Sequence, residues 1–186
     1  MVVGLRLFLA ADPGDEARHA LAALIERRLP PDVPGKVVPP ANWHVTLRFV
    51  GGVDEAERDR IVHAVDDADL GEAFSVRWGA LGAFPRPGRA TVLWIGADQG
   101  DERLTDLAER VDAAVDDAGF GAEDRPFRAH LTLRRIRPPR DVTTLVAQTE
   151  PFGVSSRIES VGLYRSHLGR GGARYELVEQ FELGKP

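Results

Sequence analysis

Cysteine is absent from all 186 residues of the chain. Its absence excludes a disulfide-stapled scaffold, a zinc site built on thiolates and a cysteine nucleophile. The sequence also lacks any apolar run near the roughly 20 residues that a membrane-spanning helix needs. The first apolar run is interrupted by Arg6 and soon followed by Asp12, a pattern that differs from a signal peptide. We therefore expect a cytoplasmic protein that has no membrane partner.

Lysine is nearly absent too, since Lys36 and Lys185 stand against 22 arginines, and the net charge is −5. An acidic balance disfavours a protein that coats duplex nucleic acid, because such a protein needs many phosphate contacts. The charge is unevenly distributed, however. Residues 98–124 hold ten acidic residues and two arginines, whereas residues 125–140 hold six arginines and no acid. The second stretch predicts a local site for an anionic ligand. The alternative, that arginine is simply the base this chain favours, stays open.

Three common catalytic signatures are missing from the sequence. It contains neither the GxGxxG of dinucleotide-binding folds nor the GxSxG of serine hydrolases. Residues 167–172 are glycine-rich, but they stand between two expected strands rather than before a helix. They therefore predict a hairpin turn and not a phosphate-binding loop.

Two short stretches share the pattern HxTx with an aliphatic residue at each x position. They are His44–Leu47, which reads HVTL, and His130–Leu133, which reads HLTL. Together they use two of the five histidines and two of the seven threonines. Each stretch lies in a run with strand character. Cross-strand hydrogen bonding would explain one such motif, but two matching motifs favour a binding or catalytic surface.

Alternation along a strand predicts which side chains of each motif share a face. The sets that it places together are His44, Thr46 and Arg48; Val45, Leu47 and Phe49; and His130, Thr132 and Arg134. The apolar set is expected to pack on a core. A face that carries histidine, threonine and arginine is unusual for a strand unless that face binds a ligand.

The other patterns predict an α+β fold, with strands that pair beside helices. Strands are expected at residues 5–10, 42–52, 74–79, 90–96, 126–136, 152–166 and 174–183, and helices at residues 16–29, 54–69, 101–118 and 142–148. Residues 81–89, which are rich in proline and glycine, are expected to form a long loop or a lid. No linker divides the chain, so we expect one domain over residues 1–186, made of two intertwined lobes.

Two histidines beside hydroxyl groups suit acid–base chemistry at phosphorus. One imidazole can take a proton from a nucleophile while the other gives a proton to the leaving group, because the ordinary pKa of histidine is near 6.5. The threonines and nearby arginines would hold the oxygens of an anion. Two histidines without a carboxylate at ligand spacing make a poor zinc site, so we expect neither a metal nor another cofactor.

With their flanks, the two motifs resemble the 2H phosphoesterases. Within that superfamily the chain resembles the bacterial and archaeal RNA 2′,3′-cyclic phosphodiesterases, also known as 2′-5′ RNA ligase-like proteins. The resemblance covers nearly the whole chain. The stretches that carry it are Leu5–Ala10, Val38–Gly51, Phe84–Pro85, Pro126–Leu133, Leu163–Ser166 and Tyr175–Glu176.

The resemblance implies a bilobal, pseudo-two-fold α+β domain with antiparallel sheets, outer helices and a central cleft that carries both motifs. It implies that His44 is the proton donor to the leaving 3′-oxygen and that His130 is the proton acceptor that activates water. Thr46 and Thr132 would hold the phosphate. The substrate would be a 2′,3′-cyclic phosphate on an RNA end or a nucleoside, and the product a 2′-phosphomonoester.

One position departs from the family pattern HxTLGR. Arg134 stands where the family has glycine, and Arg135 matches the arginine of the family. Alternation places Arg134 on the face of His130 unless a bulge shifts the register. Arg134, Arg135 and Arg48 are therefore all candidate phosphate ligands.

Other functions stay open at this level. The reverse reaction, 2′-5′ ligation of RNA, is thermodynamically linked to hydrolysis. A non-catalytic module that binds RNA ends or nucleotides is a further alternative, although such a module has no need of two proton-transfer groups. A purely structural role predicts that His44 and His130 can be replaced with loss of stability alone. We expect the protein to be a monomer.

Overall fold

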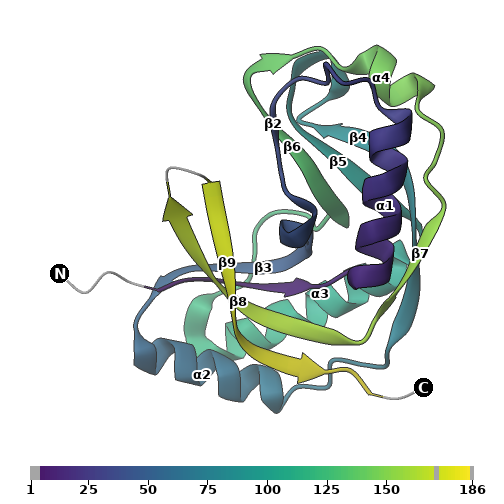
Figure 1. The fold of residues 1–186 in the computed structure, drawn as a ribbon. Coiled ribbons are helices and arrows are strands. Elements are labelled where there is room, and N and C mark those ends of the chain that lie inside the picture. The colour runs from purple at the N-terminus through teal and green to yellow at the C-terminus, as the bar shows by residue number, and fades with distance from the viewer. Residues whose placement is uncertain (1–4, 170–171, 185–186) are drawn as a thin grey trace.

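Two antiparallel sheets form the frame of the computed structural model, which describes residues 5–169 and 172–184 (Figure 1). Sheet A has the strand order β3-β1-β8-β9, and sheet B has the order β2-β6-β5-β4-β7. The strands are β1 (Leu5–Ala11), β2 (Lys36–Val37), β3 (Val45–Val53), β4 (Phe74–Phe84), β5 (Ala90–Gln99), β6 (His130–Arg140), β7 (Val154–Ile158), β8 (Ser160–Gly169) and β9 (Gly172–Glu182).

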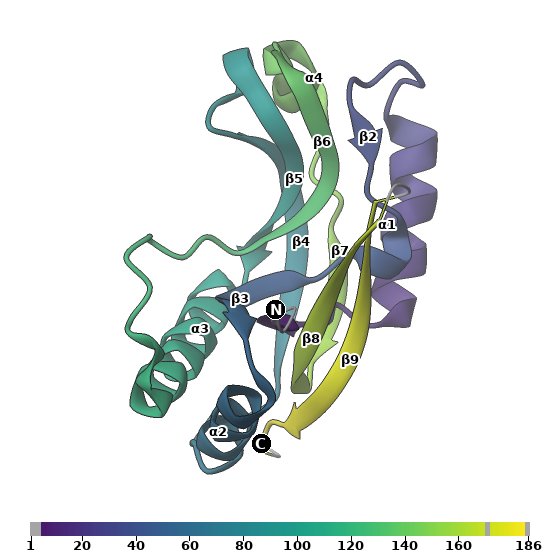
Figure 2. The same cartoon turned by 90° about the vertical axis from the view of Figure 1, so that its left-hand side faces the viewer.

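Helices lie outside the sheets. The long ones are α1 (Asp15–Arg28), α2 (Glu55–Asp66) and α3 (Asp101–Val115), and the short ones are α4 (Thr143–Gln148), η1 (Pro40–Asn42), η2 (Pro87–Arg89) and η3 (Asp116–Phe120). Helices α2 and α3 pack together beneath sheet A, whereas α1 lies along β7 and α4 lies at the far end of sheet B (Figures 1 and 2). None of the helices in the described part of the chain is long and apolar enough to cross a membrane.

The two sheets repeat one another in strand order. The order β3-β1-β8-β9 in sheet A corresponds to β6-β5-β4-β7 in sheet B, to which β2 adds an edge. In each half a strand, a helix and a motif strand follow one another, as β1-α1-β3 and β5-α3-β6, and the two strands pair antiparallel. The strands that come next are exchanged, because β4 follows the first motif but joins sheet B and β8 follows the second but joins sheet A. The expected pseudo-two-fold α+β arrangement is therefore confirmed.

One apolar core connects the two sheets. It includes Leu9 of sheet A, Ile95 of sheet B and Leu104 of α3, all without solvent exposure. Trp78 of β4 is also fully buried and donates its indole N–H to the hydroxyl oxygen of Ser156 at 2.7 Å. Because the two sheets share this core, separating them would expose apolar surface to water. That exposure costs about 25 cal/mol of free energy for each Å².

Both motif strands contain a bulge at the same position. In β3, Thr46 lies opposite Ala10 and Arg48 lies opposite Leu9, so Leu47 is an extra residue. In β6, Thr132 lies opposite Trp94 and Arg134 lies opposite Leu93, so Leu133 is extra. An extra residue reverses the alternation of side chains beyond it. The leucine of each HxTL motif is therefore the point at which the strand exchanges its two faces.

The bulge in β3 corrects the face assignment made from the sequence. Arg48, expected beside His44 and Thr46, is instead buried at 7% exposure toward α3. Phe49, expected on the core face, is instead 57% exposed and packs against Phe8, with ring centroids 6.1 Å apart. The alternation rule is correct up to Leu47 and wrong beyond it.

Sheet B extends further than the sequence patterns indicate. Strand β4 runs to Phe84, so the expected loop over residues 81–89 is wrong for its first four residues. Gly79 and Gly82 are strand residues with a steric role. A Cβ atom at Gly79 would lie 2.7 Å from the Cβ of Asp98, and one at Gly82 would lie 2.2 Å from the ring of Trp94. These glycines make room for side chains of β5 rather than for a turn.

The hairpin of β8 and β9 is longer than expected. Its strands pair from Ser160 opposite Glu182 to Gly169 opposite Gly172, so most of the expected linker over residues 167–172 is strand. The remainder of that linker, residues 170–171, lies outside the described residues. The side-chain amide of Asn42 donates to the carbonyl oxygen of Ala173 at 3.0 Å, which ties the hairpin to the segment that leads into β3.

Candidate active site

His44 lies between the short helix η1 and the start of β3. Its Nδ1 atom is 2.8 Å from the carbonyl oxygen of Asn42, two residues earlier. A carbonyl oxygen can only accept, so Nδ1 carries the hydrogen and donates it, and Nε2 is left for chemistry. The imidazole packs against Phe8 and Tyr175, whose ring centroids lie 5.0 and 5.1 Å from its own and 5.0 Å from each other.

His130 repeats this arrangement at the start of β6. Its Nδ1 atom is 2.7 Å from the carbonyl oxygen of Arg128, again two residues earlier. The aromatic neighbours here are Phe84, at 5.0 Å between ring centroids, and Trp94, at 6.1 Å. Both histidines therefore have the same tautomer and the same backbone restraint, and each has two aromatic neighbours from its own sheet.

The environment makes both imidazoles poor bases. The pKa of His44 is lowered to about 4, mainly by burial; the Asn42 carbonyl opposes this shift, and the nearby charges of His130 and Arg135 contribute to it. Burial, followed by the charge of Arg135, also lowers the pKa of His130. The two imidazoles are thus close enough to interact electrostatically, and both are neutral at pH 7 when no anion is bound.

Thr46 and Thr132 occupy matching positions before the two bulges. Each is half-buried, two residues after its histidine and on the same face. Neither hydroxyl has a hydrogen-bond partner among the residues that the structure describes. A hydroxyl can donate to an anionic oxygen, so both threonines are available to a ligand that lies between the histidines.

Arg48 and Arg134 also correspond, and both are occupied by the protein itself. The guanidinium of Arg48 forms ion pairs with Asp112 at 3.1 Å and Glu123 at 3.4 Å, and it donates to the carbonyl oxygen of Gly121. The guanidinium of Arg134 donates to the carbonyl oxygens of Val33 at 2.7 Å and Gly35 at 3.2 Å. These two candidates from the sequence are engaged away from the histidines.

Arg135 points to the opposite side of the strand from Arg134 by ordinary alternation, and the bulge at Leu133 makes that side the face of His130. It is exposed, has no ion-pair partner within the described residues, and its charge lowers the pKa of both histidines. It lies five residues after His130, as Phe49 lies five residues after His44. The two lobes therefore present a cation and an aromatic ring at equivalent positions.

Several residues of this surface have no signal in the motif itself. Tyr175 comes from β9, Phe8 from β1, and Phe84 and Trp94 from strands β4 and β5 of sheet B. Strand pairing brings them together over separations of many residues. Phe49 was visible in the sequence but was assigned to the wrong face.

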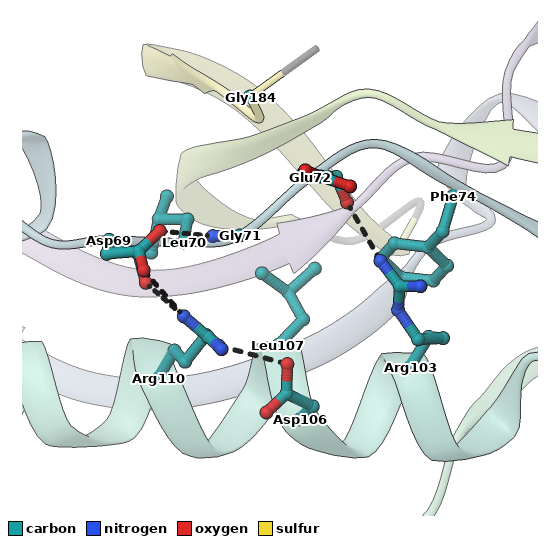
Figure 3. A pocket seen from close by; sticks show the side chains of 10 residues that line it. All are labelled: Asp69, Leu70, Gly71, Glu72, Phe74, Arg103, Asp106, Leu107, Arg110 and Gly184. Carbon is teal, nitrogen blue, oxygen red and sulfur yellow. Dashed lines mark hydrogen bonds and ion pairs between the residues drawn. The ribbon is translucent and has the colours of Figure 1, made fainter. Parts of the chain in front are cut away.

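Two cavities of the described structure lie elsewhere. The larger one, of about 570 Å³, lies between residues 69–74 and α3, and neither histidine lines it (Figure 3). Its charges are mostly satisfied internally, since Arg110 pairs with Asp69 and Asp106, and Arg103 lies over the ring of Phe74. The smaller one, of about 270 Å³, lies beside α4. No group of three His, Asp or Glu side chains that could hold a metal ion occurs in residues 5–169 and 172–184.

Comparison with known proteins gives a consistent result. Residues 12–94 and residues 95–175 each match the family of LigT-like phosphoesterases, one match for each motif. The chain belongs to this family.

Two relatives, both named RNA 2′,3′-cyclic phosphodiesterase, come from Methanothermobacter thermautotrophicus and Archaeoglobus fulgidus. The first is 33% identical over 96% of this chain and 99% of its own length, and the second is 34% identical over 96% and 100%.

Two solved structures share the fold. Escherichia coli LigT, crystallised in complex with 3′-AMP, is 27% identical and superposes with a TM-score of 0.79 over 97% of this chain and 98% of its own. The protein TT0787 of Thermus thermophilus is 30% identical, with a TM-score of 0.79 over 97% and 99%. The resemblance inferred from the HxTx motifs and their flanks is therefore confirmed.

Proposed function

We propose that this LigT-like enzyme hydrolyses 2′,3′-cyclic phosphates on RNA ends or nucleosides to 2′-phosphomonoesters. The observation that carries the proposal is the matched pair of imidazoles. His44 and His130 each fix Nδ1 on a backbone carbonyl and leave Nε2 free, and they approach from opposite sheets. In-line displacement at phosphorus requires one proton acceptor and one proton donor on opposite sides.

In the proposed reaction, Nε2 of His130 takes a proton from a water molecule, whose oxygen forms a bond to phosphorus. The bond from phosphorus to the 3′-oxygen breaks, and Nε2–H of His44 gives that oxygen a proton. The phosphate remains on the 2′-oxygen, and proton exchange with solvent restores both imidazoles. His44 must be protonated when the reaction begins, and a bound anionic phosphate favours that state because it raises the pKa of a nearby imidazolium.

The proposed phosphate ligands are Thr46, Thr132 and Arg135. Their hydroxyl and guanidinium groups have no partner in the described structure and lie on the faces that carry the histidines. Arg48 and Arg134 act instead through the loops that they hold. Phe49 offers an exposed ring at the equivalent position of sheet A, where the base of the terminal nucleotide can stack.

The proposal is tested by hydrolysis of adenosine 2′,3′-cyclic phosphate in the presence of EDTA. Wild type is expected to form adenosine 2′-phosphate, and His44→Ala and His130→Ala are each expected to lose about 10²- to 10⁴-fold in kcat. Arg110→Gln, in the cavity of Figure 3, serves as the control and should retain wild-type kcat. Undiminished turnover in either histidine variant would overturn the two-histidine mechanism.

The alternatives make different predictions in the same assay. A binding module would bind the nucleotide without turnover, and a ligase would join 2′,3′-cyclic phosphate and 5′-hydroxyl RNA ends to detectable product. Because both histidines come from one chain, we also propose that the active species is a monomer, which sedimentation at the assay concentration measures directly.

A further inference from the structure

Four arginines at one end of sheet B stand out because they have no acidic partner in the part of the chain that the structure describes. We name Arg86, Arg89, Arg137 and Arg140 the arginine strip. Arg86 precedes and Arg89 ends the short helix η2 between β4 and β5, while Arg137 and Arg140 lie in the last part of β6. All four side chains are exposed.

Backbone pairing brings these segments together. Ala90, which follows Arg89, pairs with Arg140, and the amide of Val142 donates to the carbonyl oxygen of Pro87 at 2.9 Å. The turn between β4 and β5 therefore packs beside the end of β6, as Figure 2 shows at the end of sheet B near α4. Residues separated by about 50 positions in sequence form one local surface.

Ion pairing distinguishes the strip from several other arginines of the surface, which have carboxylates beside them. These pairs are Arg58 with Asp59, Arg77 with Asp98, Arg110 with Asp106 and Arg157 with Glu159. The acid closest in sequence to the strip is Asp141, and its carboxylate already accepts the backbone N–H of Thr143 at 2.8 Å. On a chain of net charge −5, the strip is thus a local concentration of uncompensated positive charge.

The strip lies on the same strand as Arg135, one of the proposed phosphate ligands. Along β6, Arg135 and Arg137 point to the same side of the strand, because Ile136 between them is buried in the core. Arg135 lies opposite Val92 and Arg140 lies opposite Ala90, so this part of β6 is bulged and advances by only about two strand positions, or roughly 7 Å, along β5. A stacked nucleic-acid strand carries a phosphate about every 3.4 Å, so this length corresponds to about two phosphates. Arg86 and Arg89 extend the charged surface beside it on the turn between β4 and β5.

We propose that the arginine strip binds the phosphate backbone of the RNA nucleotides that precede the 2′,3′-cyclic phosphate. The proposal rests on the proposed function, which places the cyclic phosphate between His44 and His130. The cyclic phosphate is at the 3′ end of the strand, so the rest of the RNA must leave the site in the 5′ direction. It would leave past Arg135 and along the last part of β6. An RNA end then binds more tightly than a mononucleotide, because only the RNA has upstream phosphates that the strip can contact.

Salt dependence provides the test, because each phosphate contact contributes about −0.7 to the slope of log affinity against log salt for single strands. The substrates are a hexaribonucleotide with a 2′,3′-cyclic phosphate end and adenosine 2′,3′-cyclic phosphate. With three strip contacts, kcat/KM for the hexamer is expected to fall about 20-fold more than that for the mononucleotide between 50 and 200 mM salt.

The variant that replaces all four strip arginines by glutamine should lose this extra salt dependence and retain mononucleotide turnover. A charge-matched control replaces the ion-paired Arg58, Arg77, Arg110 and Arg157 by glutamine and should behave as wild type with both substrates. Equal salt slopes for the two substrates in wild type, or equal losses in the strip and control variants, would overturn the proposal. Turnover of the mononucleotide tests the proposed function separately.

Discussion

At the scale of single residues, His44 combines a buried environment with a proposed role as proton donor, which requires a charged imidazolium. The Nδ1–H bond to Asn42 fixes the ring, and Phe8 and Tyr175 exclude water from its sides. Burial therefore lowers the pKa of His44 to about 4. Protonation of His44 is therefore unfavourable in the free protein, and a bound anion would make it more favourable.

This residue should make the stability of the free protein depend on pH. The pKa of His44 falls from 6.5 in the unfolded chain to about 4 in the fold, so the unfolded state binds a proton first as the pH decreases. The contribution of His44 to the free energy of unfolding is complete above pH 6.5. It decreases by up to roughly 3 kcal/mol as the pH falls toward 4. Urea unfolding between pH 7 and pH 4 measures it. His44→Asn should remove most of the difference from this source, whereas His63→Asn, on the exposed face of α2, should not.

Phe49 allows a second prediction at this scale. If its exposed ring stacks on the terminal base, Phe49→Ala should reduce kcat/KM for adenosine 2′,3′-cyclic phosphate by about 10-fold or more, since stacking contributes about 1–3 kcal/mol per base. Ribose 2′,3′-cyclic phosphate without a base should react equally well with both proteins. Leu177→Ala removes another exposed apolar side chain of sheet A and is the control. A similar loss on the substrate without a base would mean that Phe49 acts on the phosphate or on the fold.

At the scale of elements, the bulges decide which arginine serves which purpose. After each extra leucine, the next residue turns toward the protein interior or its loops, and the one after it turns to the histidine face. Arg48 and Arg134 take the first position, and Phe49 and Arg135 take the second. In β6 the inserted residue thus separates a structural cation, Arg134, from a cation available to substrate, Arg135. In β3 it separates the structural cation Arg48 from the exposed ring of Phe49.

Replacing Arg48 should mainly reduce stability, whereas replacing Arg135 should mainly reduce activity. Arg48→Met is expected to destabilise the protein by about 3 kcal/mol, because it leaves the carboxylates of Asp112 and Glu123 without their buried partner. Arg135→Gln should leave the urea midpoint near that of wild type and reduce kcat/KM by about 10²-fold, the typical loss for one preorganised donor. Parallel urea and kinetic measurements distinguish them. Stability loss in Arg135→Gln without loss of activity would contradict this assignment.

The elements also show where the sequence was informative. Alternation correctly placed Thr46 with His44 and Thr132 with His130, because no bulge separates them. It failed at Arg48 and Phe49 because an extra strand residue leaves no local mark in the sequence and is visible only in the pairing with β1. Gly82 was interpreted as part of a loop, since the Trp94 ring that requires it comes from a neighbouring strand. The partners of Arg48 lie more than 60 residues away, beyond any local pattern.

At the scale of the whole molecule, the pseudo-two-fold arrangement joins two similar half-sites into one asymmetric site. The histidines, their carbonyl partners and the threonines match between the sheets. The residues at the fifth position after each histidine do not, because sheet A presents Phe49 and sheet B presents Arg135. The proposed site is therefore asymmetric, with its unpaired positive charge on the side of His130, the proposed proton acceptor, and its exposed aromatic ring on the side of His44, the proposed proton donor.

The electrostatic link between the sheets is measurable in the pH profile of kcat/KM, which reports the pKa values of the free enzyme. Burial and the charge of Arg135 lower the pKa of both histidines, so the profile should reach its maximum below pH 6.5. Removing that charge raises both pKa values, and Arg135→Gln should shift the whole profile to higher pH in addition to lowering it. Arg135→Lys keeps a positive charge and should keep the position of the maximum, and Arg77→Gln, remote from both histidines, should change neither feature. A profile that falls in height but does not move in Arg135→Gln would mean that Arg135 contacts the phosphate without acting on the histidines, and that the two lobes are coupled through the substrate alone.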